Sequence, residues 1–152
     1  MAKFLTLNTH SWMEDEQEKK LDQLAERILQ EKYDVICLQE VNQEMESEQV
    51  VQAPFYHAVD GAIAIHKDHF AHCLVERLVE KGLIYHWSWA YNHIGFDRFH
   101  EGVAILSLNP LKPRELLVSD ANDPTDYHTR KVLLAETEVD GRLVTVASCH
   151  LS

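Results

Sequence analysis

Two periods of hydrophobic and polar residues follow each other along the first forty positions. Residues 3–8 (KFLTLN) alternate and then turn polar, which predicts a strand that ends at Asn8. Residues 16–31 have apolar side chains three and four positions apart, which indicates one face of an amphipathic helix. Residues 33–38 form a mostly apolar run without glycine, which predicts a strand buried on both faces, with Glu40 at or just past its end. The order strand, helix, strand predicts a crossover between parallel strands.

The later part of the chain repeats both periods. Apolar residues on one helical face predict a helix at residues 69–81, capped by Asp68 and followed by Gly82, where a helix-ending residue is favoured. Four aromatic residues at alternate positions predict a strand at residues 83–91 with an aromatic face. The other predicted elements are strands at 102–108 and 111–118 and a hairpin of 131–139 with 142–149 around Asp140-Gly141. Residues 53–65 show no assignable period, and the polar segments 42–53, 92–101 and 119–129 are expected to be connections.

The chain has 152 residues, of which 45% are hydrophobic, so it is long and apolar enough for one domain with a core. No apolar run approaches the roughly 20 residues that span a membrane, and the first residues lack the pattern of a secretory signal. The three cysteines, Cys37, Cys73 and Cys149, are an odd number and form no CxxC pair. We therefore expect free thiols and a cytoplasmic protein, rather than disulfides or a zinc site.

The net charge of −11 narrows the possible partners. It argues against sequence-independent binding of nucleic acid by the protein alone, because such binding needs a basic surface. It does not argue against an enzyme that handles phosphate through a metal ion, since acidic ligands are then required.

Polar residues suited to phosphate chemistry stand at the ends of several predicted strands. Asn8 and Glu40 follow neighbouring parallel strands, which places them at the same end of the sheet. A carboxylate such as Glu40 can hold a hard cation such as Mg²⁺, although a single glutamate can also simply close a strand in solvent. His150 follows the last strand and can donate a proton to an oxygen on which charge develops. A carboxylate such as Glu101 can hold that histidine in one tautomer.

Four segments together resemble the endonuclease/exonuclease/phosphatase superfamily in their order and spacing. They are residues 5–9 (LTLNT), 36–41 (ICLQEV), 101–107 (EGVAILS) and 144–151 (VTVASCHL). The resemblance implies an α/β fold, a four-layer α/β/β/α sandwich in which two packed β-sheets carry helices outside, as in pancreatic deoxyribonuclease. It also implies cleavage of a phosphate ester that depends on Mg²⁺ or Mn²⁺.

The resemblance also implies roles for individual residues. Glu40 matches the metal-ligand glutamate, and Asn8 matches the active-site asparagine of the first strand. His150 matches the histidine that assists the leaving group or steadies the transition state, and Glu101 matches the glutamate that pairs with it in the nuclease branch. Arg130 falls where some members have an arginine that meets phosphate. His10 falls where some members have an acidic ligand for a second metal, so the number of metals stays open.

Two segments typical of the superfamily are missing from these residues. A strand ending in Gly-Asp-Phe-Asn and a later Ser-Asp-His stretch, which supplies the general base, do not occur. We therefore expect residues 1–152 to be the N-terminal part of a single domain, about half of the sandwich, and to be inactive when separated from the rest. Apolar strands that lack their second sheet would expose a face or an edge, so we expect the separated chain to self-associate.

Several alternatives stay open. A non-catalytic acidic module that binds a partner through its open sheet edge is the competing class, and it predicts no dependence on Mg²⁺. The substrate could be a phospholipid head group, a nucleotide or nucleic acid, or a sugar phosphate. The histidines at positions 66, 69 and 72 have no HExxH or Cys-His companions, which favours a solvated helical face over a metal site. His93 and His100 flank the expected site and could contact substrate.

Overall fold

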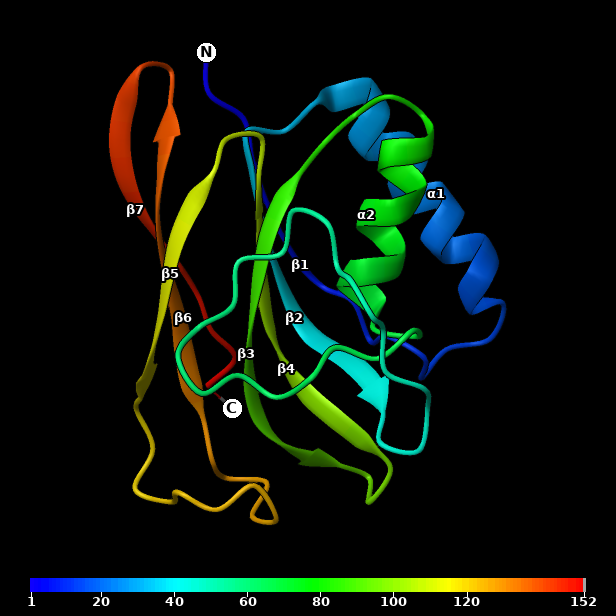
Figure 1. Cartoon of the computed structure of the whole chain (residues 1–152), viewed down its shortest axis with the longest axis vertical. Coiled ribbons are helices and arrows are strands. Elements are labelled where there is room, and N and C mark those ends of the chain that lie inside the picture. Colours follow the sequence, from blue (N-terminus) through cyan, green and yellow to red (C-terminus); the bar gives the residue numbers. More distant parts are fainter. Residues whose placement is uncertain (152) are drawn as a thin grey trace.

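The computed structural model describes residues 1–151, which fold into seven strands and two helices (Figure 1). In chain order they are β1 (Phe4–Asn8), α1 (Gln17–Glu31), β2 (Val35–Glu44), α2 (Phe70–Glu80), β3 (His86–Gly95), β4 (Phe99–Ser107), β5 (Leu111–Leu117), β6 (Lys131–Val139) and β7 (Arg142–Ser148). Each strand and helix predicted from the hydrophobic periods is present, with boundaries that differ by a few residues.

The strands form two sheets, one of four strands in the order β1-β2-β4-β3 and one of three in the order β5-β6-β7. The β1 and β2 strands are parallel, which confirms the predicted crossover through α1, and the other neighbours are antiparallel. Both helices cover one face of the larger sheet, and the smaller sheet packs on the other face (Figure 1). The described residues therefore form three layers, which are the helical layer and both sheets of an α/β/β/α sandwich. This confirms the predicted fold class.

Successive side chains along the strands point to opposite faces of the larger sheet and contribute to two hydrophobic cores. The β4 residues Ala104 and Leu106 face the helices, whereas Val103 and Ile105 face the smaller sheet. Because both faces of β4 are covered, its sequence is continuously apolar, as a strand buried on two sides requires. The predicted aromatic face of the β3 region is confirmed: Tyr85, Trp87 and Trp89 are almost fully buried in the core beneath the helices.

The histidines at the start of α2 contradict the expected solvated face. His66, His69 and His72 are only 5%, 0% and 5% exposed. His69 packs against the indole rings of β3, with ring centroids 5.1 Å from Trp87 and 4.6 Å from Trp89. The expectation was wrong because the aromatic face of the sheet extends under the first turn of this helix.

The cap of α2 also differs from the prediction. His69, not Asp68, occupies the N-cap position and accepts a hydrogen bond from the His72 backbone N–H. The Asp68 carboxylate instead accepts from the Glu44 backbone N–H at 2.9 Å and from the Ser47 hydroxyl at 2.6 Å. Asp68 therefore ties the end of β2 to the segment that precedes α2.

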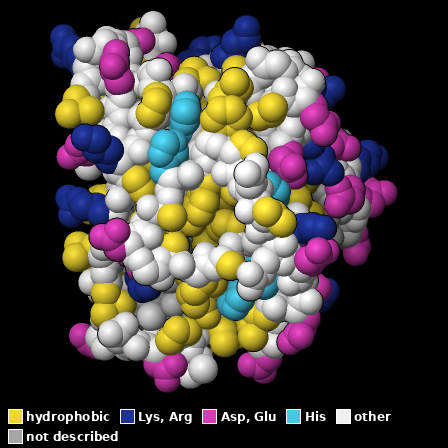
Figure 2. Space-filling model, viewed as in Figure 1, with side chains coloured by type: hydrophobic (Ala, Val, Ile, Leu, Met, Phe, Trp, Pro, Cys, Tyr) yellow, Lys and Arg dark blue, Asp and Glu magenta, His cyan; other side chains and the backbone are white. Residues whose placement is uncertain are grey.

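Figure 2 shows charged side chains along the edges of one face, over the helices and over the smaller sheet, and hydrophobic side chains in the middle of that face. The helix α1 has a net charge of only −1, because its acidic residues are nearly balanced by basic ones; they are Glu18, Asp22, Glu26 and Glu31 against Lys19, Lys20 and Arg27. Neither of the helices in residues 1–151 is long and apolar enough to cross a membrane.

Candidate active site

A strained bulge in β2 places Glu40. The register between β2 and β4 shifts between Leu38 and Val41, and Glu40 has a φ of 52°, in the left-handed region that non-glycine residues seldom adopt. The sequence predicts that the strand ends near Glu40. In the structure the strand is interrupted at Glu40 and continues to Glu44. Bulges and left-handed residues of this kind are enriched at functional sites, where they redirect a side chain.

The segment after β1 clamps the bulge through hydroxyl groups. The Ser11 hydroxyl donates to the Glu40 backbone oxygen at 2.6 Å and accepts from the Asn42 backbone N–H at 2.8 Å. The Thr9 hydroxyl donates to the same Glu40 oxygen at 2.9 Å. Ser11 is fully buried, so these bonds satisfy backbone groups that the interrupted ladder leaves without a strand partner.

The structure brings Asn8, His10 and Glu40 together at one sheet end. Asn8 pairs in register with Gln39, the residue before Glu40. The Asn8 side-chain oxygen accepts from the His10 backbone N–H at 3.1 Å, and His10 Nε2 lies 3.7 Å from Glu40 Oε2. The Glu40 side chain is 18% exposed, so its carboxylate still reaches solvent. The shared placement of Asn8 and Glu40 agrees with the expectation from parallel strands.

The end of β7 is attached to the same part of β2. The Ser148 hydroxyl donates to the Leu38 backbone oxygen at 3.2 Å, and the Gln39 side-chain amide donates to that hydroxyl at 3.4 Å. His150 follows two residues later and is half-buried. Within residues 1–151, its side chain forms no hydrogen bond or ion pair with Glu101.

Glu101 pairs with a different histidine from the one that the resemblance implied. Its Oε2 lies 3.1 Å from Nε2 of His93 on the neighbouring strand β3. The other ring nitrogen of His93, Nδ1, lies 2.7 Å from Nη1 of Arg130, just before β6. The strands β3 and β4 extend into residues 92–101, which the sequence predicts to be a polar connection. This extension places His93 directly opposite Glu101.

Two residues at this site carry little signal in the sequence. Ser11 stood in a polar connection with no distinguishing pattern. His93 lies near the expected site in the sequence. The direction of its side chain, however, depends on a register shift between Tyr91 and His93 that the alternation of polar and apolar residues does not reveal. The only available signal was the short spacing between His93 and Glu101 across a glycine-containing turn.

The Glu40 carboxylate suits a metal that keeps most of its water. No cluster of three or more histidine, cysteine, aspartate or glutamate side chains capable of holding a metal occurs in residues 1–151. Glu40 therefore offers a single, solvent-reaching carboxylate. Mg²⁺ commonly binds through one or two carboxylates together with waters and substrate phosphate, so Glu40 fits one part of such a site.

Comparison with known proteins decides the family. The model of the endonuclease/exonuclease/phosphatase family matches residues 13–150. The chain belongs to this family. Its members include nucleases and phosphatases, and the family is generally hydrolytic. No curated protein matches the sequence significantly.

Solved structures of other proteins share the fold. An endonuclease/exonuclease/phosphatase family protein from Leptotrichia buccalis is 30% identical, with a TM-score of 0.87 over 100% of this chain and 54% of its own. A family protein from Beutenbergia cavernae is 18% identical, with a TM-score of 0.61 over 98% of this chain and 37% of its own. TDP2 from D. rerio, in complex with a single-strand DNA product, is 13% identical, with a TM-score of 0.50 over 97% and 44%. The chain thus spans about half the length of the first of these relatives.

Proposed function

We propose that residues 1–152 form the N-terminal part of a phosphoesterase, a phosphodiesterase or phosphatase, that uses Mg²⁺ or Mn²⁺. The observation that carries this proposal is the position of Glu40 on a strained bulge, next to Asn8 and open to solvent. Strain at a charged residue is maintained only where surrounding bonds over-determine it, and Ser11 and Thr9 supply those bonds here. Membership in a generally hydrolytic family supports the same reading.

Each residue of the site has a proposed task. Glu40 holds the metal, which when bound supplies Lewis-acid stabilisation of the phosphoryl charge. Asn8 uses its side-chain oxygen to accept from His10, which orients its amide N–H groups for donation to a phosphate oxygen. Arg130 meets the phosphate as a guanidinium donor. His150 donates to the leaving-group oxygen, and Glu101 supplies the carboxylate that pairs with His93.

Removing the Glu40 carboxylate tests this proposal. The substitution Glu40→Gln in the complete gene product should lower the Mg²⁺-dependent release of product from a chromogenic phosphate ester by at least about 100-fold, because charge stabilisation at a reacting phosphoryl group is lost. Glu44→Gln is the matched control, since Glu44 lies on the same strand and its carboxylate pairs with Arg98. If wild type and Glu40→Gln both release product no faster than the uncatalysed background, with or without Mg²⁺, the result would instead support the non-catalytic binding module.

Separating the chain from the rest of the protein gives a second test. Residues 1–152 alone should show no turnover, because the group that activates water is proposed to lie outside them. Turnover of the separated chain near that of the complete protein would contradict this part of the proposal.

A further inference from the structure

We propose that His93 is a positioning residue for Arg130, which it holds through an unprotonated Nδ1 while Glu101 fixes its protonated Nε2. The inference rests on the proposed function, because Arg130 matters for catalysis only if it meets a phosphate. It concerns a residue that the family resemblance did not assign, and it gives Glu101 a partner other than His150.

The three side chains form a continuous chain from β4 through β3 to the start of β6. Glu101 Oε2 lies 3.1 Å from His93 Nε2, and Arg130 Nη1 lies 2.7 Å from His93 Nδ1. His93 is 4% exposed and Glu101 is 8% exposed, so neither has free access to water. A Cβ on Gly95 would lie 3.1 Å from Glu101 Oε1, so the carboxylate packs closely over this glycine. A buried carboxylate and imidazole in such contact determine each other's orientation.

The chemistry of the two partners determines the tautomer of His93. A carboxylate only accepts hydrogen bonds, so Nε2 must carry a proton to bond Glu101. A guanidinium only donates, so Nδ1 must be bare to bond Arg130. The neutral Nε2–H tautomer satisfies both at once, whereas an imidazolium would place two donors and two positive charges 2.7 Å apart.

The backbone oxygen of Thr129 is compatible with the same assignment. It lies 3.1 Å from His93 Nδ1 and 3.3 Å from Arg130 Nη1. Because Arg130 can donate to this oxygen, His93 does not need a proton on Nδ1 to satisfy it. Arg130 Nη1 also donates to the Tyr127 backbone oxygen, so His93 completes a set of acceptors around one end of the guanidinium.

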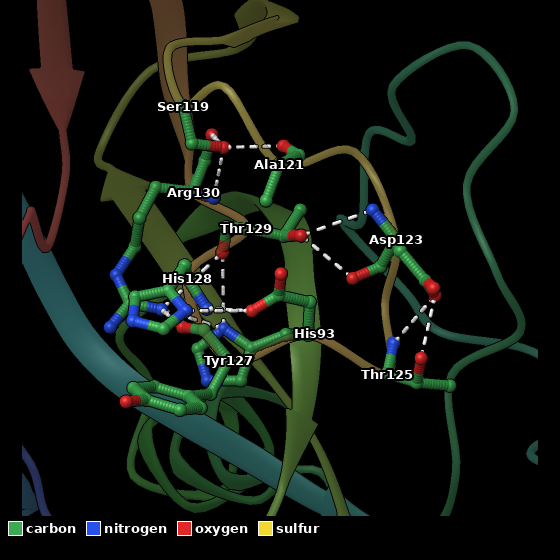
Figure 3. A network of polar contacts seen from close by, with 10 residues as sticks. His93, Ser119, Ala121, Asp123, Thr125, Tyr127, His128, Thr129 and Arg130 are labelled. Atoms are coloured by element: carbon green, nitrogen blue, oxygen red, sulfur yellow. Dashed lines mark hydrogen bonds and ion pairs between the residues drawn. The ribbon is translucent and has the colours of Figure 1, made fainter.

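The surrounding loop fixes the backbone of Arg130 and offers backbone oxygens to its guanidinium, and His93 adds a side-chain acceptor from a separate strand. The Arg130 backbone N–H donates to the Ser119 hydroxyl at 2.8 Å, and the Thr129 hydroxyl donates to the Asp123 backbone oxygen at 2.7 Å. Figure 3 shows this loop folded over β3, with the side chains of His93 and Arg130 turned toward each other. A guanidinium already held by His93 does not have to be ordered when phosphate binds, which favours binding.

Two substitutions of His93 separate the two bonds. In His93→Asn, the side-chain oxygen takes about the place of Nδ1 and can still accept from Arg130, but the bond to Glu101 is lost. In His93→Gln, the longer amide reaches about the place of Nε2 and can still donate to Glu101, but the acceptor for Arg130 is lost. Both variants should be made in the complete gene product and assayed with a phosphate-ester substrate and Mg²⁺.

The positioning role predicts that His93→Gln is the more damaging variant for substrate binding. Its KM should rise about tenfold with a smaller change in kcat, whereas the KM of His93→Asn should stay within about twofold of wild type. A purely structural role predicts the opposite order, because His93→Asn leaves the buried Glu101 without its partner. A higher KM and a lower Tm in His93→Asn than in His93→Gln would therefore overturn the proposal.

A measurement independent of activity keeps the two proposals distinguishable. Long-range ¹H–¹⁵N spectra of the complete gene product should show His93 as the neutral Nε2–H tautomer at neutral pH. A proton on Nδ1 would overturn the positioning role whatever the activity. If wild type hydrolyses no phosphate ester while His93 has the expected tautomer, the proposed function is wrong. The contacts among Glu101, His93 and Arg130 would then orient Arg130 without a role in catalysis.

Discussion

A fall in pH should destabilise this protein through the buried imidazole of His69. This side chain is 0% exposed, between the indole rings of Trp87 and Trp89. Its Nδ1 accepts from the His72 backbone N–H at 3.4 Å, and its Nε2 has no hydrogen-bond partner within residues 1–151. Burial, together with the nearby His72, His66 and His100, lowers the pKa of His69 well below the ordinary value of 6.5.

The magnitude follows from the difference in proton uptake between the folded and unfolded chain. The folded state keeps His69 neutral, whereas the unfolded chain takes up a proton below about pH 6.5. The stability that depends on a neutral His69 is therefore complete above that pH and is lost as the pH falls, by about 1.4 kcal/mol for each pH unit. Between about pH 7.5 and pH 5.5 we expect His69 alone to account for a loss of about 1.4 kcal/mol. Burial also lowers the pKa of His72 and of His100, so both add losses of the same sign.

Urea unfolding of wild type and His69→Leu at both pH values measures this loss. The quantity to compare is the change in the free energy of unfolding between the two pH values, in which the packing cost of the substitution cancels. The change should be smaller in His69→Leu by about 1.4 kcal/mol. His128→Leu is the comparison at the surface, because this histidine lies on the loop before β6 and not in the core. An equal pH response in wild type and His69→Leu would refute the burial argument.

Three further predictions concern the bulge, the sheet and the exposed face. Ser11→Ala should lower the free energy of unfolding by about 1–3 kcal/mol, because the buried Asn42 N–H loses its partner. It should also lower the Mg²⁺-dependent rate, because the bulge at Glu40 loosens. Denaturant unfolding and the phosphate-ester assay measure these two effects. Gly102→Ala should cost about 2–5 kcal/mol in unfolding free energy, because a Cβ would lie 2.1 Å from the Ala90 backbone oxygen and 2.6 Å from Trp89 Nε1; a fall in Tm of less than a few degrees would contradict it. Residues 1–152 alone should self-associate in light scattering through the β5-β6-β7 sheet, and Leu143→Lys, at a side chain 74% exposed, should reduce the association.

The local period of the sequence determined most of the elements. Period-two and period-3.6 patterns need only neighbouring residues, so the crossover β1-α1-β2, the aromatic face of β3 and the hairpin at Asp140-Gly141 were all predictable. The placement of Asn8 beside Glu40 was predictable for the same reason, because two parallel strands joined by one helix end at the same edge.

The interruptions of those periods were not predictable. The bulge at Glu40 and the register shift before His93 depend on hydrogen bonds with distant segments, such as that of Ser11, which no local pattern encodes. The burial of His69 likewise depends on how α2 sits over the indole rings of β3.

The sequence by itself therefore determined the layers of the fold, the family resemblance and the candidate residues Asn8, Glu40, Glu101, Arg130 and His150. Only the tertiary structure decided which of these residues touch, because contact depends on strand register and side-chain direction across separate elements. It joined Glu101 to His93 rather than to His150, and it placed Arg130 at the other nitrogen of the same ring.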